Sequence, residues 1–256
     1  MAELSSLKIG DKSVKRLGLG TNRIADNDQS RAVLKKAVEL GVQLIDTAQL
    51  YGQSQRVIGH TLAPYPNDLL IATKGGYSQN QTRELAYGID ESLRLLKLET
   101  IDLWQLHRVK ADTPLEDTMR FLKDQMASGK IKSAGLSEVT VEQIETARKI
   151  VPITSVQNRY NLHDRGHEVV LDYCTEQNII FMPFFPLASG RSADDEKLQR
   201  IAAKYGAGAT QIALAWLLKR SPIMLPIPGT LSVEHLESNL AAAKIDLSDQ
   251  DFKALS

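Results

Sequence analysis

The chain has 256 residues, 43% of them hydrophobic and 24% charged, and its 31 basic and 31 acidic side chains balance to zero formal charge. The two signs are interspersed, which argues against a nucleic-acid or membrane-surface binder. No apolar run approaches the roughly 18 residues of a membrane span, the one cysteine cannot form an internal disulfide, and residues 1–5 carry no secretory signal, so we expect a cytoplasmic protein.

Short apolar segments alternate with longer amphipathic ones, beginning with a hairpin over residues 7–14 that turns at Gly10-Asp11. The predicted strands are residues 16–19, 43–46, 69–74, 101–106, 131–136, 154–157, 179–182 and 223–226. The predicted helices are residues 30–40, 84–96, 115–126, 141–150, 168–176 and 196–205, with a last short helix opened by a capping box at Ser248-Asp249-Gln250-Asp251.

Eight strands, most of them followed by a helix, are the number that closes a (β/α)8 barrel, and such barrels typically have about 250 residues. No linker rich in Gly, Ser or Pro interrupts the chain. We therefore predict one α/β domain over residues 1–256, a TIM barrel with an N-terminal β-hairpin and extra C-terminal helices.

Titratable side chains stand at the ends of three consecutive predicted strands. Asp46 ends the second strand and Tyr51 follows in the loop, Lys74 ends the third strand, and His107 follows the fourth. Taken singly, each has an ordinary explanation as a turn residue, a packing residue, a solvated cation or a rim histidine. Consecutive barrel strands are neighbours, however, and active sites lie at their carboxyl ends. We therefore expect the four groups to converge on one site.

The order of motifs along the chain resembles that of the aldo-keto reductase superfamily. The segments that carry the resemblance are Gly18-Leu19-Gly20-Thr21, Ile45-Asp46-Thr47-Ala48 with Tyr51-Gly52, Ala72-Thr73-Lys74, Leu106-His107, Gly135-Leu136-Ser137, Gln157-Asn158, Pro186-Leu187 and Ile227-Pro228-Gly229-Thr230. They lie within residues 18–239, nearly the whole chain. The compact length and Phe184-Phe185-Pro186-Leu187 look like bacterial members near the pyridoxal reductase-like branch.

The resemblance implies a role for each strand-end residue. Tyr51 would be the general acid that protonates a carbonyl oxygen, although a free phenol titrates near 10. Lys74 would lower the pKa of Tyr51, Asp46 would hold Lys74 charged and oriented, and His107 would donate a hydrogen bond to the carbonyl. The hydride would come from NADP(H).

Gly18 begins a G-x-G-x-x-G pattern that ends on Arg23 instead of glycine, which argues against a Rossmann site. The resemblance implies instead that the cofactor lies extended across the barrel mouth. Ser137 and Gln157 would bind the nicotinamide carboxamide and Phe184 would stack on its ring. The residues implied to contact NADP(H) are Gly20, Thr21, Asn22, Ser137, Gln157, Phe184, Pro186, Leu187, Gly229, Thr230, Ser232, His235 and Asn239. Of these, Thr230, Ser232 and His235 would surround the 2′-phosphate and Asn239 the adenine.

Three residues depart from the pattern of the family. Gly229 stands where many members have lysine, and His235 where many have arginine, so we expect weaker and more pH-dependent NADPH binding. Glu138 stands where asparagine is common, and its carboxylate cannot donate a hydrogen bond to the cofactor amide.

The loop after His107 is short and we expect no C-terminal tail over the barrel mouth, so we expect an open pocket that accepts small aldehydes and ketones. Tyr77, Trp104 or Phe185 would supply apolar contacts. We expect a monomer with no nucleic-acid or membrane partner and no metal. Two alternatives stay open: a dinucleotide-binding regulatory subunit without turnover, and Schiff-base chemistry at Lys74.

Overall fold

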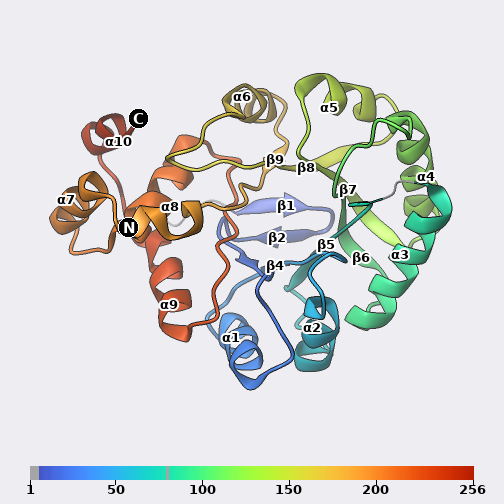
Figure 1. Cartoon of the computed structure of the whole chain (residues 1–256), viewed down its shortest axis with the longest axis horizontal. Helices are drawn as coiled ribbons and strands as arrows, with labels where there is room; N and C mark the ends of the chain where they lie inside the picture. Colours follow the sequence, from blue (N-terminus) through green and yellow to red (C-terminus); the bar gives the residue numbers. More distant parts are fainter. Residues whose placement is uncertain (1–5, 79–80) are drawn as a thin grey trace.

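Seven parallel strands form one curled sheet surrounded by helices (Figure 1). The computed structural model describes residues 6–78 and 81–256. Residues 1–5, in which the sequence predicts no secretory signal, lie outside the described residues. The strands neighbour one another in chain order: β3 (Leu19–Gly20), β4 (Leu44–Asp46), β5 (Leu70–Gly75), β6 (Ile101–Leu106), β7 (Ile131–Ser137), β8 (Ile153–Gln157) and β9 (Ile180–Phe181). This order is the one expected for a (β/α)8 barrel.

The eighth predicted strand, residues 223–226, is an irregular segment. Pro226 has no N–H and cannot donate to a ladder. The segment nevertheless bonds to both of its neighbours. The Leu225 N–H donates to Phe181 O at 2.8 Å, and the Gly18 N–H donates to Pro226 O at 3.0 Å. Isolated hydrogen bonds therefore close the ring where a regular eighth strand was expected.

The predicted hairpin covers the end of the barrel at which the strands begin. It consists of β1 (Leu7–Ile9) and β2 (Lys12–Val14), with Gly10 at φ 60° in the turn. Lys12 pairs with Asp102 at 2.9 Å, near the start of β6. Ile9 and Val14 are buried against side chains of the barrel, among them Leu44, Leu70, Leu103, Ile180, Leu225 and Ile227. With this end covered, a ligand has access from the carboxyl ends of the strands.

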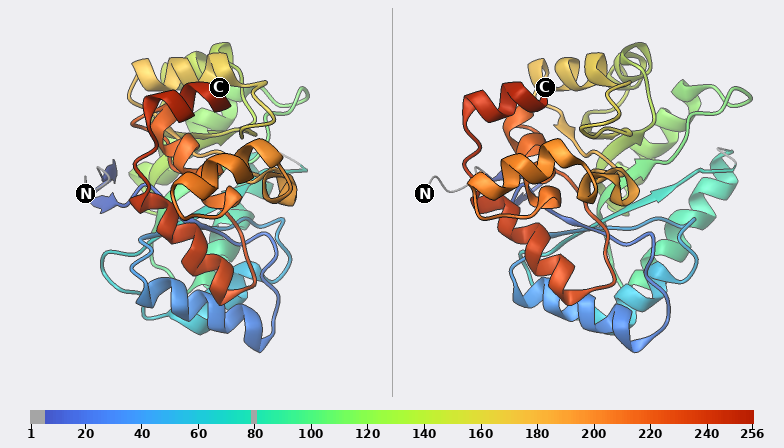
Figure 2. Two further views of the ribbon diagram at one scale, coloured as in Figure 1. Left: turned by 90° about the vertical axis from the view of Figure 1, so that its left-hand side faces the viewer. Right: turned by 60° about the vertical axis from the view of Figure 1, so that its left-hand side comes forward.

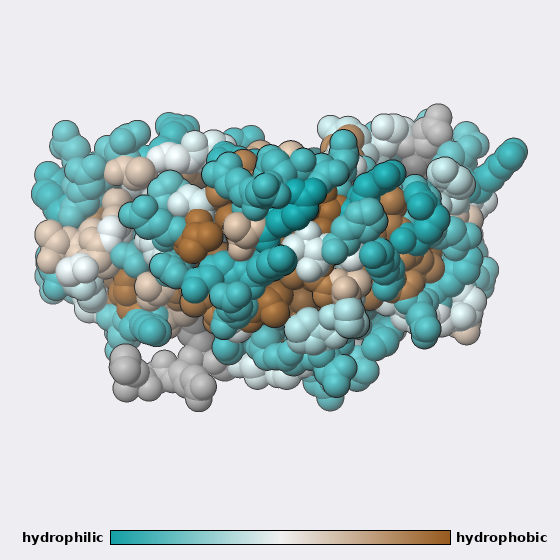
Figure 3. Space-filling model, turned by 90° about the horizontal axis from the view of Figure 1, so that it is seen from below, coloured by the Kyte–Doolittle hydropathy of each residue, from teal (hydrophilic) through white to brown (hydrophobic). Residues whose placement is uncertain are grey.

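Helices pack around the outside of the sheet, as the two side views confirm (Figure 2). They are α1 (Asp28–Glu39), α2 (Ser54–Leu62), α3 (Thr82–Leu96), α4 (Leu115–Ala127), α5 (Val141–Arg148), α6 (Glu168–Glu176), α7 (Glu196–Lys204), α8 (Ala209–Arg220), α9 (Val233–Ala241) and α10 (Asp249–Leu255), with 3₁₀ helices η1 (Ala188–Ala193) and η2 (Ala242–Lys244). Hydrophilic side chains cover much of the outer face seen from below in Figure 3. Within the described ranges, no helix is long and apolar enough to cross a bilayer.

Three helices, α2, α8 and α9, were not among the predicted ones. Seven consecutive residues of α8, Ile212–Leu218, are buried, so the helix has no polar face and lacks the 3.6-residue periodicity that reveals a helix in sequence. α2 begins without a capping side chain. The capping interaction predicted at the start of the last helix is present, since Ser248 Oγ accepts a hydrogen bond from the Asp251 N–H at 3.1 Å.

Candidate active site

A cavity of about 610 Å³ opens at the carboxyl ends of the strands. Its walls come from the ends of β3, β4, β7 and β8, from the loops after β4, β5 and β6, from residues 184–187 and η1, from residues 227–230, and from α9. The volume is within the roughly 300–1,000 Å³ usual for small-molecule sites. The cavity is therefore the place at which the predicted site residues are to be sought.

A buried ion pair lies beneath the floor of the cavity, and of its two members only Asp46 belongs to the cavity lining. Lys74 Nζ donates to Asp46 Oδ2 at 2.6 Å and to Thr47 O at 2.9 Å, and neither charged side chain is more than 2% exposed. β4 pairs with β5 so that Asp46 faces Ala72. Lys74, two residues further along, lies on the same face of β5 as Ala72. Burial lowers the pKa of Lys74, and the carboxylate of Asp46 opposes that shift.

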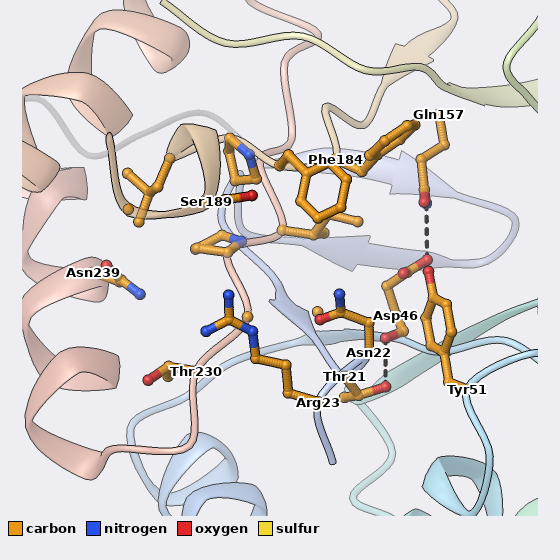
Figure 4. A pocket seen from close by; sticks show the side chains of 18 of the residues that line it. Thr21, Asn22, Arg23, Asp46, Tyr51, Gln157, Phe184, Ser189, Thr230 and Asn239 are labelled. Atoms are coloured by element: carbon orange, nitrogen blue, oxygen red, sulfur yellow. Dashed lines mark hydrogen bonds between the residues drawn. The ribbon is translucent and has the colours of Figure 1, made fainter. Parts of the chain in front are cut away.

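Tyr51 lies against this pair. Lys74 Nζ is 5.0 Å from the centroid of the Tyr51 ring, and Figure 4 shows the phenol hydroxyl pointing toward the Asp46 carboxylate. Burial raises the pKa of Tyr51, and Asp46 raises it further, whereas Arg108 lowers it. The net direction is opposite to the one implied by the resemblance, and the cation that opposes the rise is Arg108, not Lys74. The phenol is therefore protonated at neutral pH.

His107 completes the predicted group of four. Its ring centroid is 6.1 Å from that of Tyr51 and 4.9 Å from that of Tyr77. Burial lowers the pKa of His107 to about 3, helped by the charges of Lys74 and Arg108, so the imidazole is neutral. Its Nδ1 is buried and has no hydrogen-bond partner among the described residues. A buried polar atom left unpaired costs about 1–3 kcal/mol.

Gln157 is tied into the floor by a network that the sequence did not indicate. Its Nε2 donates to Asp46 Oδ1 at 2.9 Å, drawn in Figure 4, and to Gln105 Oε1 at 3.0 Å. Gln105 in turn donates to Ser155 Oγ at 2.9 Å. Gln105 was missed, and its only signal was an amide inside a buried strand. Both carboxylate oxygens of Asp46 are thus hydrogen-bonded.

Ser137, at the end of β7, is buried next to Arg108. Arg108 Nη1 donates to Ser137 Oγ at 3.3 Å and also to His107 O. Because the serine oxygen accepts this bond, its own proton is available for an acceptor in the cavity. Arg108 was not among the predicted site residues, although it lines the cavity.

The remaining predicted cofactor residues lie along the cavity away from this floor. Those that line it are Gly20, Thr21, Asn22, Phe184, Pro186, Leu187, Gly229, Thr230, His235 and Asn239. The Thr21 hydroxyl is already engaged, since it donates to Asp46 O at 2.8 Å and accepts from Ser54. Ser232 is outside the lining and caps α9, its Oγ accepting from the His235 N–H at 3.2 Å.

Gly229 packs directly against Gly20. A Cβ at Gly229 would lie 2.9 Å from Gly20 O, and one at Gly20 would lie 2.6 Å from Ile227 O. A lysine at position 229 would therefore require the backbone to move, which gives this departure from the family pattern a steric reason. Arg23, also missed, extends across the middle of the cavity between Asn22 and Thr230 (Figure 4).

The structure also shows where Glu138 and the three predicted substrate contacts lie relative to the cavity. Glu138 is outside the cavity lining, and its Oε1 accepts from the Arg159 N–H at 2.8 Å. Trp104 was named as a substrate contact, which is wrong because it is fully buried outside the cavity lining. Tyr77 and Phe185 do line the cavity, and about 40% of each is exposed.

Comparison with known proteins gives consistent matches. The aldo/keto reductase family profile matches residues 16–256, a range that contains every cavity residue. An uncharacterized oxidoreductase of Schizosaccharomyces pombe is 39% identical, covering 99% of this chain and 90% of that protein. Pyridoxine 4-dehydrogenase of Escherichia coli is 36% identical, with coverages of 98% and 97%. A solved aldo-keto reductase from Klebsiella pneumoniae in complex with NADPH has a TM-score of 0.92 at 26% identity, covering 100% of this chain and 94% of that one.

Proposed function

Since the chain belongs to the aldo/keto reductase family, we propose that it uses NADPH to reduce small aldehydes and ketones to alcohols. The observation that carries the proposal is the grouping of Tyr51 and His107 over the buried pair Asp46–Lys74, inside the cavity. We propose these four residues as the catalytic set, as in the sequence-based hypothesis.

The cavity residues fit a dinucleotide phosphate. Gly20 and Gly229 have no side chains where the backbone segments meet, and α9 contributes His235 from its first turn and Asn239 from near its end. A helix N-terminus favours anions through its unpaired N–H groups, and Arg23 adds positive charge in the same cavity. At the other end, Ser137 and Gln157 would hold the nicotinamide amide and Phe184 would pack on its ring. The bound cofactor would supply the hydride that adds to the carbonyl carbon.

Tyr51 supplies the proton. Because its pKa is raised, the hydroxyl is protonated before reaction and can donate to the carbonyl oxygen, which becomes the alcohol hydroxyl. The phenolate left behind forms within 5.0 Å, measured from ring centroid to Nζ, of the ammonium of Lys74. The cation is thus placed to stabilise the charge that develops during the step.

The other residues position the reacting groups. Neutral His107 has one ring N–H with which to orient the carbonyl oxygen. Asp46 is held by Lys74 and Gln157, so the ammonium cannot leave the floor without exposing an unpaired buried charge. The same burial argues against Schiff-base chemistry, because Lys74 is fully buried and outside the cavity lining.

The first test is a thermal-shift titration with NADPH and NADH, followed by absorbance at 340 nm with an aldehyde panel that includes 4-nitrobenzaldehyde. We expect a larger stabilisation by NADPH and oxidation of NADPH that depends on the aldehyde. Stabilisation by NADPH without turnover of any carbonyl compound would favour the regulatory-subunit alternative. Trapping of substrate by borohydride would favour the Schiff base.

A further inference from the structure

The side chain of Gln105 reaches across three strands inside the barrel. Its partner on β7 is Gly135, which in turn pairs with Ser155 on β8. The Gln105 Nε2 donates to Ser155 Oγ at 2.9 Å and to Met182 Sδ at 3.5 Å. A Cβ at Gly135 would overlap Ser155 Oγ and would lie 2.9 Å from Gln105 Cγ. Glycine at position 135 is therefore what allows the amide to reach β8.

The orientation of this amide is passed on to Gln157. Because both N–H groups of Gln105 are engaged, its Oε1 remains to accept, and it does so from Gln157 Nε2 at 3.0 Å. The same Nε2 donates to Asp46 Oδ1 at 2.9 Å. The Asp46 carboxylate, which is paired with Lys74, only accepts hydrogen bonds. The nitrogen of Gln157, and not its oxygen, must therefore face Asp46.

These bonds leave Gln157 with one polar side-chain atom for a ligand. Both hydrogens of its amide are used inside the barrel, and no residue described by the structure donates to its Oε1. The side chain nevertheless lines the cavity. Since a carbonyl oxygen only accepts, the ligand group that Gln157 can bind is a hydrogen-bond donor. In a nicotinamide, that donor is the NH₂ of the carboxamide.

We propose that Gln105 is a positioning residue, which holds the Gln157 carbonyl toward the cofactor so that the site recognises the NH₂ of the nicotinamide carboxamide. The inference rests on the proposed NADPH-dependent function and adds to it a residue outside the cavity lining. Because Gln157 also holds Asp46, the network joins the buried ion pair to the cofactor amide.

The test uses a cofactor analogue in which this one group is changed. In 3-acetylpyridine adenine dinucleotide phosphate, a methyl group replaces the NH₂ of the carboxamide. Calorimetric titration of wild type should give a Kd for the oxidised analogue roughly 5- to 100-fold higher than for NADP⁺, because Gln157 Oε1 is left without a donor. In Q105M this ratio should fall by about threefold or more, because the freed N–H of Gln157 can turn toward the carbonyl of the analogue.

Two further variants separate positioning from stability. Q105E keeps an oxygen that can accept from Gln157, and it should keep most of the wild-type ratio. Q55M is the matched control, because Gln55 is a buried glutamine that donates to Thr73 Oγ1 and Ser92 Oγ, outside the cavity lining. Its ratio should equal that of wild type, even where thermal unfolding shows a loss of stability as large as that of Q105M.

Three results would overturn the proposal. They are equal Kd values for NADP⁺ and the analogue in wild type, a ratio that Q105M leaves unchanged, and a ratio that falls equally in Q105M and Q55M. Failure of the reductase proposal is distinguishable from these. If wild type bound NADP⁺ but reduced no carbonyl compound, the reductase proposal would fail, while a lower ratio in Q105M alone would still support the role of Gln105. Absence of NADP⁺ binding would overturn both.

Discussion

The two ends of the cavity are built differently. At the floor, Asp46, Lys74 and Gln157 are at most 2% exposed and hydrogen-bonded to one another. Away from this floor, Arg23 in the middle of the cavity and His235 at its far end are exposed, and water can already satisfy their polar groups. A preorganised floor makes proton transfer sensitive to any substitution, whereas an exposed end tolerates changes of charge. The departure at position 235 lies at the tolerant end, whereas position 229 is sterically restricted by the backbone of Gly20.

The largest effect is expected from Tyr51→Phe. Removing only the proton donor should lower kcat by roughly 10²–10⁴-fold and leave NADPH affinity unchanged. The measurement is steady-state oxidation of NADPH with 4-nitrobenzaldehyde, alongside a thermal-shift titration. Tyr65→Phe is a matched control, because that hydroxyl bonds to Leu96 O, away from the cavity. A Tyr51→Phe variant with near-normal turnover would exclude the role.

Lys74→Met tests whether the floor depends on its ion pair. The substitution leaves the Asp46 carboxylate buried without its cation, which should cost about 3–5 kcal/mol of unfolding free energy in addition to activity. Denaturant unfolding measures the loss of stability. In the double variant Lys74→Met/Asp46→Asn, part of that stability should return while turnover stays low. Additive losses in the double variant would contradict the pairing.

The lowered pKa of His107 predicts how the free energy of unfolding depends on pH. The pKa of His107 is lowered from about 6.5 to about 3 in the folded protein, so below pH 6.5 the unfolded chain binds a proton that the native state does not. Stability should therefore fall as pH decreases from 6.5 toward 3, with a contribution from this group of up to about 1.4 kcal/mol per pH unit. His107→Gln should show a shallower decline. Parallel curves for the two proteins would count against a buried neutral imidazole.

The smallest effect is expected from a substitution at the exposed end of the cavity. His235→Arg adds a permanent charge at the start of α9, and we expect NADPH to bind roughly three- to tenfold more tightly while NADH is unaffected. Calorimetric titration with both cofactors measures the difference. An equal gain for both cofactors would mean that position 235 does not face the 2′-phosphate.

The strand-end residues could be predicted because a barrel brings the ends of neighbouring strands together whatever the loops do. Asp46, Lys74 and His107 therefore converge as expected. Gln105 and Arg108 could not be predicted, since a hydrogen-bond network depends on which way each side chain turns. The closure of the barrel and helix α8 could not be predicted either. Pro226 prevents a regular eighth strand, and α8 has no polar face that would give its sequence a helical periodicity.

The most direct test of the account is a crystal structure of the protein with NADP⁺. The account predicts the nicotinamide next to Tyr51 and His107, with its amide at Ser137 and Gln157, and the adenosine phosphate at the start of α9. A dinucleotide bound outside this cavity, or one with its adenine over Tyr51, would contradict the assignment of the buried floor as the catalytic end.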